Sequence, residues 1–179
     1  MADAAEIVYV PADRGHRNRV IGLLTALAVL VLDQAVKWAV TYIFQLRERI
    51  EIKLLPFFRL SWTENRGVSM GFLTTDSALE RWLLVALTAA IAGFVAAWLW
   101  REKKRDDVVA LGLVLGGALG NILDRVRLGY VVDYADLHFG DIHPFLVFNV
   151  GDAAITIGVL LLVLRALLTR DRKPPQKDE

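Results

Sequence analysis

The sequence contains no cysteine in its 179 residues. A disulfide bond, a thiolate nucleophile and a cysteine-ligated zinc site are therefore excluded. An excess of charge of one sign is also lacking, since 21 Lys and Arg residues nearly balance 20 Asp and Glu residues and the net charge is +1. The sequence has no basic patch interleaved with aromatic residues, so we expect no nucleic-acid partner.

Long apolar runs dominate the sequence. Hydrophobic residues make up 55% of the chain, and the mean hydropathy is +0.43. A run of about 20 apolar residues is long enough for a helix to cross a bilayer. Four such runs are present, at about residues 20–44, 79–100, 108–124 and 145–168. We therefore predict an all-α membrane protein, a four-transmembrane-helix bundle whose single domain covers residues 20–168 between polar tails at 1–19 and 169–179.

Basic residues cluster on one predicted side of the spans. Arg14 and Arg19 precede the first run, residues 101–105 follow the second, and the C-terminal tail begins with basic residues. Cytoplasmic segments of membrane proteins are enriched in Lys and Arg. The pattern predicts that both termini are cytoplasmic and that residues 45–79 and 125–143 lie on the extracytoplasmic side, although the first of these segments carries basic residues of its own.

The two outer segments differ in what they predict. Residues 50–54 and 57–62 favour β-strands and are separated by Pro56, which indicates a small extracytoplasmic β-sheet or hairpin. Trp62 in this segment is suited to the headgroup layer of a membrane. We expect residues 127–143 to be mobile and to act as a lid.

The first run carries two charged residues within its apolar stretch. Asp33 and Lys37 lie four residues apart, so they share a helix face and can pair inside the bundle. The pairing is compatible with a structural role and with direct substrate contact. The run is longer than the apolar core of a signal peptide, follows a polar tail and lacks a small-residue cleavage pattern, so we expect an uncleaved span.

The third run has a regular pattern of glycines. Gly112, Gly116 and Gly120 recur every four residues, which predicts a flat helix face that a neighbouring helix can approach closely. Asn121 and Asp124 lie on an adjacent face. We therefore expect these polar groups to stand on a tightly packed helix, which is a rigid support for a site.

Two aspartates lie near the predicted outer boundary of the membrane. A charge at such a position costs roughly 2.5 to 3.5 kcal/mol, which favours a function for it. Asp133 lies in the outer connection, and we expect the fourth helix to begin near Pro144. Asp152 would then lie about 12 Å along that helix, with Asn149 on the same face. Facing carboxylates titrate together, so we interpret Asp133 and Asp152 as a catalytic pair in which one activates water and the other donates a proton to a carbonyl oxygen.

Five motifs carry a resemblance over nearly the whole chain. They are Asp33-Gln-Ala-Val-Lys37-Trp38, Asn65-Arg-Gly67-Val-Ser69, Gly116-Gly-Ala-Leu-Gly120-Asn121-Ile-Leu-Asp124-Arg125, Val131-Val-Asp133-Tyr134 and Phe148-Asn149-Val-Gly-Asp152-Ala153. With these motifs in this order, the chain resembles signal peptidase II, the bacterial four-span membrane aspartyl protease that removes signal peptides from lipidated prolipoproteins. It departs from the family's usual pattern at Gly151, where alanine is common, and at Met70, where an aromatic residue is commoner.

The resemblance implies an aspartic endopeptidase of the bacterial cytoplasmic (inner) membrane, with its active site on the extracytoplasmic side. It implies cleavage just before the diacylglyceryl-modified cysteine, with Asp133 and Asp152 as the catalytic residues and with no metal or other cofactor. The implied partners are prolipoprotein signal peptides and membrane lipid, and the chain is expected to be monomeric. The other implied roles are substrate binding for Asn65, Gly67, Asn121, Arg125 and Asn149, and structural support for Asp33, Lys37 and Asp124.

The residue types fit these roles physically. Asn121 and Asn149 can both donate and accept hydrogen bonds, so they can pair with a substrate backbone that has left its own helix. Arg125 presents a planar fork of donors. That fork suits substrate carbonyl groups and, equally, a lock on the neighbouring Asp124.

Two other kinds of hydrolytic site can be drawn from the sequence. Residues 67–71 match the G-x-S-x-G motif with Ser69 as nucleophile, but that motif needs a helix directly after it, and we expect none before about residue 79. His138, Asp141 and His143 resemble metal ligands, but the helical HExxH pattern of zinc proteases is missing. We therefore prefer the aspartate pair to both.

A small proton-coupled transporter or channel is the alternative from another functional class. Asp33, Lys37 and Asp152 would form its relay, since ionisable residues inside a membrane often mark such pathways. Against it, the acids cluster at one edge and no inverted repeat is visible.

Overall fold

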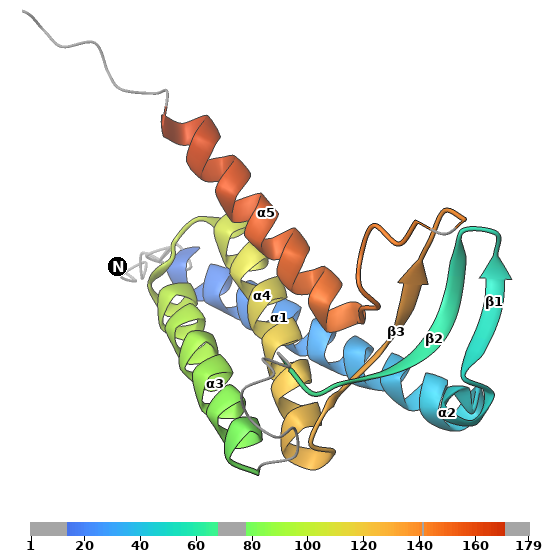
Figure 1. The fold of residues 1–179 in the computed structure, drawn as a ribbon. Helices are drawn as coiled ribbons and strands as arrows, with labels where there is room; N and C mark the ends of the chain where they lie inside the picture. The colour runs from blue at the N-terminus through green and yellow to red at the C-terminus, as the bar shows by residue number, and fades with distance from the viewer. Residues whose placement is uncertain (1–13, 68–77, 141, 171–179) are drawn as a thin grey trace, which may run out of the picture.

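The computed structural model describes residues 14–67, 78–140 and 142–170 (Figure 1). In chain order the elements are α1 (Arg14–Trp38), the π-helical turn η1 (Ala39–Ile43), α2 (Leu46–Arg49), β1 (Glu51–Leu55), β2 (Phe58–Asn65), α3 (Ala78–Arg101), α4 (Arg105–Arg127), β3 (Val131–Leu137) and α5 (Val150–Arg170). The helices α1, α3, α4 and α5 are long and apolar enough to cross a membrane. The predicted four-helix bundle with a small sheet is therefore confirmed.

Helix α4 lies at the centre of the bundle and packs against α1, α3 and α5 (Figure 1). Its glycines explain the close packing. A Cβ added to Gly116 would collide with the backbone carbonyl of Ala26 on α1, and one added to Gly117 would collide with the carbonyl of Gly151 on α5. At Gly112 the added atom would lie 2.5 Å from another carbonyl oxygen of α1. The glycine face predicted from the sequence is confirmed, and Gly117 adds a second close contact.

The three strands form an antiparallel sheet in the order β1-β2-β3, beside the start of α5 (Figure 1). The hairpin of β1 and β2 was expected, but β3 was not. Strand β3 pairs with β2 so that Asp133 lies opposite Thr63, and Val132 is buried in a cluster with Val40 and Leu46. The prediction of a mobile lid at residues 127–143 is therefore wrong for β3, because pairing and burial hold this strand.

Helix α5 begins at Val150, later than the predicted start near Pro144. Phe148 explains the delay, because it bonds to Ala135 of β3 through two backbone hydrogen bonds of 2.8 and 3.0 Å and is held extended. Asn149 then caps the helix. Its Oδ1 accepts the backbone N–H of Asp152 at 2.9 Å, and its own N–H donates to Asp152 Oδ2 at 3.2 Å, a reciprocal cap. Asp152 therefore lies in the first turn of α5 and not about 12 Å along it.

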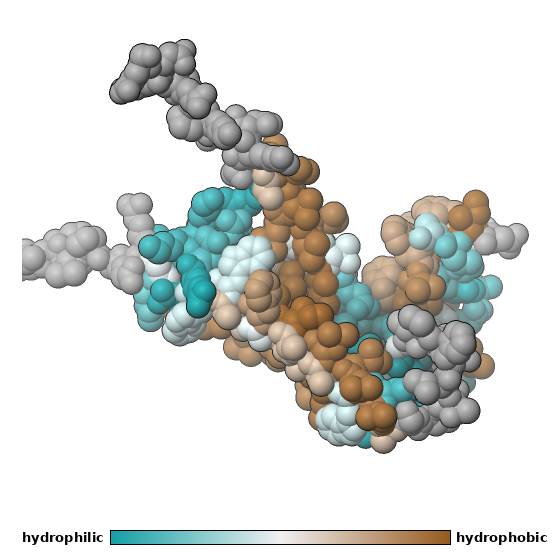
Figure 2. All heavy atoms as spheres, turned by 60° about the vertical axis from the view of Figure 1, so that its left-hand side comes forward, coloured by the Kyte–Doolittle hydropathy of each residue, from teal (hydrophilic) through white to brown (hydrophobic). Residues whose placement is uncertain are grey.

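Hydrophobic side chains cover the outer faces of the long helices. Figure 2 shows them along the helices, with hydrophilic residues gathered at one end of the bundle and over part of the sheet. Leu24 of α1, Phe94 of α3 and Leu160 of α5 are all exposed. A continuous apolar surface of this kind is what contact with lipid requires.

Candidate active site

Asp133 and Asp152 lie on either side of one asparagine. Asp133 belongs to β3 and is 1% exposed, whereas Asp152 lies in the first turn of α5 and is partly exposed. The side-chain amide of Asn149 donates to Asp133 Oδ1 at 2.6 Å, and its backbone N–H donates to Asp152 Oδ2 at 3.2 Å. The two aspartates singled out in the sequence thus share one hydrogen-bonding neighbour.

The other carboxylate oxygens of the two aspartates also accept amide hydrogens. Asn65 Nδ2 of β2 donates to Asp133 Oδ2 at 3.0 Å, and Asn121 Nδ2 of α4 donates to Asp152 Oδ1 at 2.8 Å. Each of the four oxygens therefore has one N–H donor. Such bonds favour the ionised form and fix the plane of each carboxylate.

Burial raises the pKa of Asp133 from 3.8 to about 6, and the nearby charge of Asp152 raises it as well. Hydrogen bonds from Asn65 and Asn149 act in the opposite direction, as does the charge of Lys37. A carboxyl group with a pKa near 6 can both hold and release a proton close to neutral pH. This is the property that a general acid or base needs.

Backbone N–H groups fix the orientation of two of the three asparagines. The N–H of Gly67 donates to Asn65 Oδ1 at 3.0 Å, and the N–H of Asp152 donates to Asn149 Oδ1 at 2.9 Å. An N–H group can only donate, so the amide oxygen must face it. The NH₂ groups of Asn65 and Asn149 must then point to Asp133.

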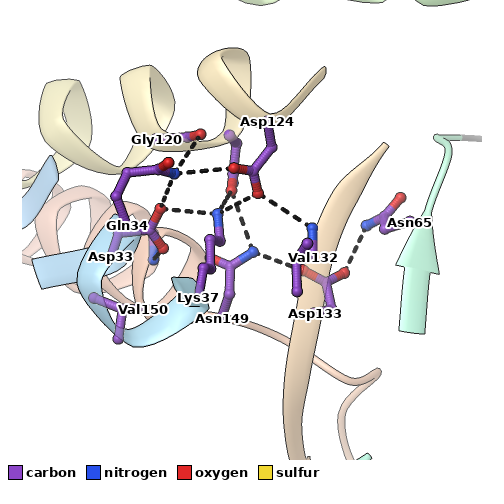
Figure 3. Close-up of polar contacts among 12 residues, drawn as sticks. Asp33, Gln34, Lys37, Asn65, Gly120, Asp124, Val132, Asp133, Asn149 and Val150 are labelled. Atoms are coloured by element: carbon purple, nitrogen blue, oxygen red, sulfur yellow. Dashed lines mark hydrogen bonds and ion pairs between the residues drawn. The ribbon is translucent and has the colours of Figure 1, made fainter. Parts of the chain in front are cut away.

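A buried ion-pair cluster lies directly beside Asn149 and Asp133 (Figure 3). Lys37 Nζ contacts Asp33 Oδ2 at 2.8 Å and Asp124 Oδ2 at 2.9 Å, which confirms the pairing predicted for Asp33 and Lys37. Asp33 also accepts the N–H of Gly151 at 2.9 Å, and Asp124 accepts the N–H of Val132 at 3.2 Å. The cluster therefore connects α1 and α4 to the two elements that carry the aspartates.

Sequence reasoning missed Gln34, which lies in the same cluster (Figure 3). Its Nε2 donates to Asp124 Oδ1 at 2.9 Å and to the carbonyl of Gly120 at 3.3 Å. Its position three residues before Lys37 was an available signal, since residues with that spacing share a helix face. Tyr134 was also missed, and its hydroxyl accepts the N–H of Val150 at the start of α5 at 3.3 Å.

The residues expected to bind substrate differ in what they contact. Asn149 is fully buried, and its amide hydrogens go to Asp133 and to Asn121 Oδ1, so its contacts favour a supporting role. Asn65 is exposed, and among the described residues its side-chain NH₂ group has one acceptor, Asp133. Arg125 Nε is buried without a hydrogen-bond partner among the described residues, and the carboxylate of Asp124 is instead bound by Lys37, Gln34 and Val132.

Gly67 is required by its backbone. Its φ of +102° lies in the region that side chains rarely adopt, and an added Cβ would collide with the side chain of Leu84. The contact of its N–H with Asn65 therefore depends on glycine at this position.

The histidines expected as alternative metal ligands take part in a network on the sheet. His138 and His143 stack with ring centres 5.8 Å apart, His143 Nδ1 lies 3.2 Å from Asp136 Oδ1, and Arg59 pairs with Asp136 Oδ2 at 2.6 Å. Burial acts to raise the pKa of Asp136, but hydrogen bonds from Arg59 and His143 outweigh it, so the pKa lies below its ordinary value. Within the described part of the chain, no group of three or more acidic or histidine side chains is placed to hold a metal ion. Ser69 and Asp141 lie outside the described residues.

The fold is that of a multi-pass bacterial membrane enzyme. A solved structure titled as a bacterial membrane enzyme, at 2.3 Å resolution, matches 88% of this chain and 94% of its own with a TM-score of 0.72 and 25% sequence identity. A second structure with a similar title, at 1.9 Å resolution, covers 82% of this chain and 92% of its own with a TM-score of 0.68 and 28% identity.

The chain belongs to the signal peptidase II family, whose model, described as signal peptidase (SPase) II, matches residues 25–168. The lipoprotein signal peptidase of Rhizorhabdus wittichii is 62% identical over 167 residues, which cover 93% of this chain and 97% of that protein. The lipoprotein signal peptidase of Sphingopyxis alaskensis is 54% identical over 151 residues, covering 84% and 87%. The protein is therefore a peptidase, and the transporter alternative finds no support.

Proposed function

We propose that this peptidase cleaves signal peptides from diacylglyceryl-modified bacterial prolipoproteins, just before the lipidated cysteine, with Asp133 and Asp152 as its catalytic pair. The assignment of prolipoproteins as the substrate is supported by relatives named lipoprotein signal peptidase. One observation above all supports the aspartic mechanism. The two carboxylates come from different elements, share Asn149, and include one group whose pKa is raised to about 6.

The two carboxyl groups divide the proton transfers between them. Burial and the raised pKa suit Asp133 to hold a proton, while the partly exposed Asp152 takes a proton from water. The water oxygen attacks the carbonyl carbon of the scissile bond as Asp133 donates its proton to the carbonyl oxygen. When the C–N bond breaks, the proton on Asp152 passes to the departing amine of the cysteine, and Asp133 recovers a proton from the tetrahedral intermediate.

Arg125 and Asn65 are the side chains with capacity to bind the substrate backbone. Arg125 Nε has no internal partner among the described residues, and Asn65 is exposed beside Asp133. A peptide segment that has left its helix needs such donors for its carbonyl groups, because lipid offers none.

The site lies at the end of the bundle opposite the basic loop that joins α3 to α4. Helix α4 begins at Arg105 beside that loop and reaches the ion-pair cluster at Asp124. Basic loops face the cytoplasm, so the site would face the extracytoplasmic side and both termini the cytoplasm.

Single substitutions test the catalytic pair. Asp133→Asn and Asp152→Asn should each reduce cleavage of a peptide carrying a diacylglyceryl cysteine by at least about 10²-fold, because general acid and base action contributes that much or more. Product formation is followed by mass spectrometry of the released signal peptide. Asp136→Asn is the matched control, since Asp136 lies on the same strand but pairs with Arg59, and it should retain cleavage.

Thermal denaturation in detergent separates loss of chemistry from loss of fold. A folded Asp133→Asn or Asp152→Asn variant that cleaves at the wild-type rate would refute the aspartic mechanism. So would an activity that disappears with a chelator and returns with added zinc.

A further inference from the structure

Lys37 makes three contacts, of which charge neutralisation explains only two. The side chain of Lys37 is 4% exposed, and its ammonium lies 2.8 Å from Asp33 Oδ2 and 2.9 Å from Asp124 Oδ2 (Figure 3). It also lies 3.0 Å from Asn121 Oδ1. An ammonium has three N–H donors and no acceptor, so all its donors are used. The third contact goes to a neutral amide that itself touches Asp152.

This third contact determines which end of the Asn121 amide faces Asp152. A carboxamide can be turned end for end, and its neighbours decide between the two orientations. Lys37 can only donate, so Asn121 Oδ1 must face it and Nδ2 must face Asp152 Oδ1, as observed at 2.8 Å. In the reversed orientation a carbonyl oxygen would meet the carboxylate and an NH₂ group would meet the ammonium.

Asn149 also donates a hydrogen bond to Asn121 Oδ1 and so favours the same orientation of the Asn121 amide, but less strongly than Lys37 does. Its Nδ2 donates to Asn121 Oδ1 at 3.2 Å, but the same group also serves Asp133 at 2.6 Å. The bond from Lys37 is charge-assisted and shorter, and such bonds are roughly twice as strong as neutral ones.

We propose that Lys37 is a positioning residue for the catalytic pair, because it fixes the amide of Asn121 as a donor to Asp152. The proposal rests on the proposed function, since it assigns the residue to the Asp133 and Asp152 pair. Lys37 also acts on the pair through its charge, which lowers the pKa of Asp133.

A double variant that keeps the wild-type net charge of the cluster tests the proposal, together with a single variant that keeps the ammonium. Lys37→Met combined with Asp124→Asn removes one positive and one negative charge, so the net charge of the buried cluster is unchanged, and Asp124→Asn alone is the control that keeps the ammonium. We expect the double variant to lose about 10²-fold in kcat relative to the control, as misplacement of a reacting group does, with KM unchanged. The limb of the pH profile set by Asp133 should also move to higher pH.

A second comparison asks whether the effect passes through Asn121. Lys37→Arg keeps the charge but moves the donors, and it should lower kcat in the wild-type background and have no further effect when Asn121→Leu is present. This cycle decides the question if the double variant fails to fold, because Lys37→Arg retains the positive charge that faces Asp33 and Asp124. Equal losses in both backgrounds would assign Lys37 to the fold alone.

The outcomes separate this proposal from the proposed function. If Asp133→Asn and Asp152→Asn are inactive while Lys37→Met/Asp124→Asn matches Asp124→Asn in kcat and pH profile, only the positioning role is overturned. If both aspartate variants remain active, the catalytic pair itself is wrong.

Discussion

Three asparagines deliver hydrogens to the two aspartates, and each is oriented by a neighbour that can only donate. The neighbours are the N–H of Gly67 for Asn65, the N–H of Asp152 for Asn149 and the ammonium of Lys37 for Asn121. No amide in the site is therefore free to reverse. The four carboxylate oxygens of Asp133 and Asp152 therefore each face the hydrogen of an N–H donor.

Asp133 makes the stability of the protein depend on pH. Burial raises its pKa from 3.8 to about 6, so between these values the folded protein binds a proton more readily than the unfolded chain. The free energy of unfolding should therefore fall as the pH rises from about 4 to about 6, by up to about 3 kcal/mol. In Asp133→Asn this slope should be absent, as measured by chemical denaturation in detergent at a series of pH values.

Asp136 gives the control with the opposite sign. The pKa of Asp136 is lowered in the folded protein, so its carboxylate stabilises the fold at neutral pH. This stabilisation is lost as the pH falls below the ordinary pKa of an aspartate, 3.8. Asp136→Asn should therefore leave the slope from Asp133 intact. An identical slope in wild type and Asp133→Asn would contradict the assignment to Asp133.

At the residue scale, the sequence predicted which side chains meet but not how the amides are used. The spacing of Asp33 and Lys37 predicted their ion pair, because four residues return a helix to the same face. Asn149 was expected to bind substrate, yet both its amide hydrogens are used inside the site. The orientation of the Asn121 amide depends on Lys37, which is 84 residues earlier in the chain, so a local sequence pattern cannot predict it.

At the scale of helices, glycine allows α4 to contact two neighbours directly. Gly116→Ala should lower the free energy of unfolding by about 1 to 3 kcal/mol, because the new methyl group would collide with the Ala26 carbonyl and force the helices apart. Thermal denaturation in detergent measures the change as a lower Tm.

Gly93→Ala on α3 is the matched control. No atom lies within 4 Å of the position that its Cβ would take. Alanine should be neutral or stabilise the helix there by up to about 1 kcal/mol, from its higher helix propensity. Equal effects of the two substitutions would show that close packing at Gly116 is unimportant.

Strand β3 and the start of helix α5 were both mispredicted because each depends on residues that are distant in sequence. The length of the apolar runs predicted the four spans, and the β-favouring residues on either side of Pro56 predicted the hairpin of β1 and β2. Strand β3 was missed because its partner, β2, lies more than sixty residues earlier in the chain. The start of α5 was misplaced for the same reason, since Phe148 is held by Ala135 and not by local sequence.

At the scale of the whole molecule, the absence of cysteine permits a direct test of topology. Lys53→Cys on β1 and Lys104→Cys in the basic loop each introduce a single exposed thiol. If the basic loop is cytoplasmic, a membrane-impermeant maleimide should label Lys53→Cys while the cytoplasmic membrane is intact. Lys104→Cys should be labelled only after that membrane is opened, and the reverse result would invert the proposed orientation.

The family and the arrangement of spans were predictable from the sequence because motifs and hydrophobic length are local properties. Residues 25–168 match the family model, and the four spans fall within or close to the predicted ranges. The direction in which a substrate enters is not a local property. It depends on how the sheet and the bundle enclose Asp133 and Asp152 together.

The hydrogen bonds between Ala135 and Phe148 carry a consequence for sequence variation in this enzyme. Asp133 lies two residues before Ala135, and Asp152 lies four residues after Phe148, so the main chain itself spans the interval between the two acids. These bonds join main-chain atoms, so they do not depend on the hydrogen-bonding groups of the side chains at 135 and 148. Proline is the exception, because it has no N–H to donate, so at either position it would remove one of the two bonds while leaving both aspartates in the sequence.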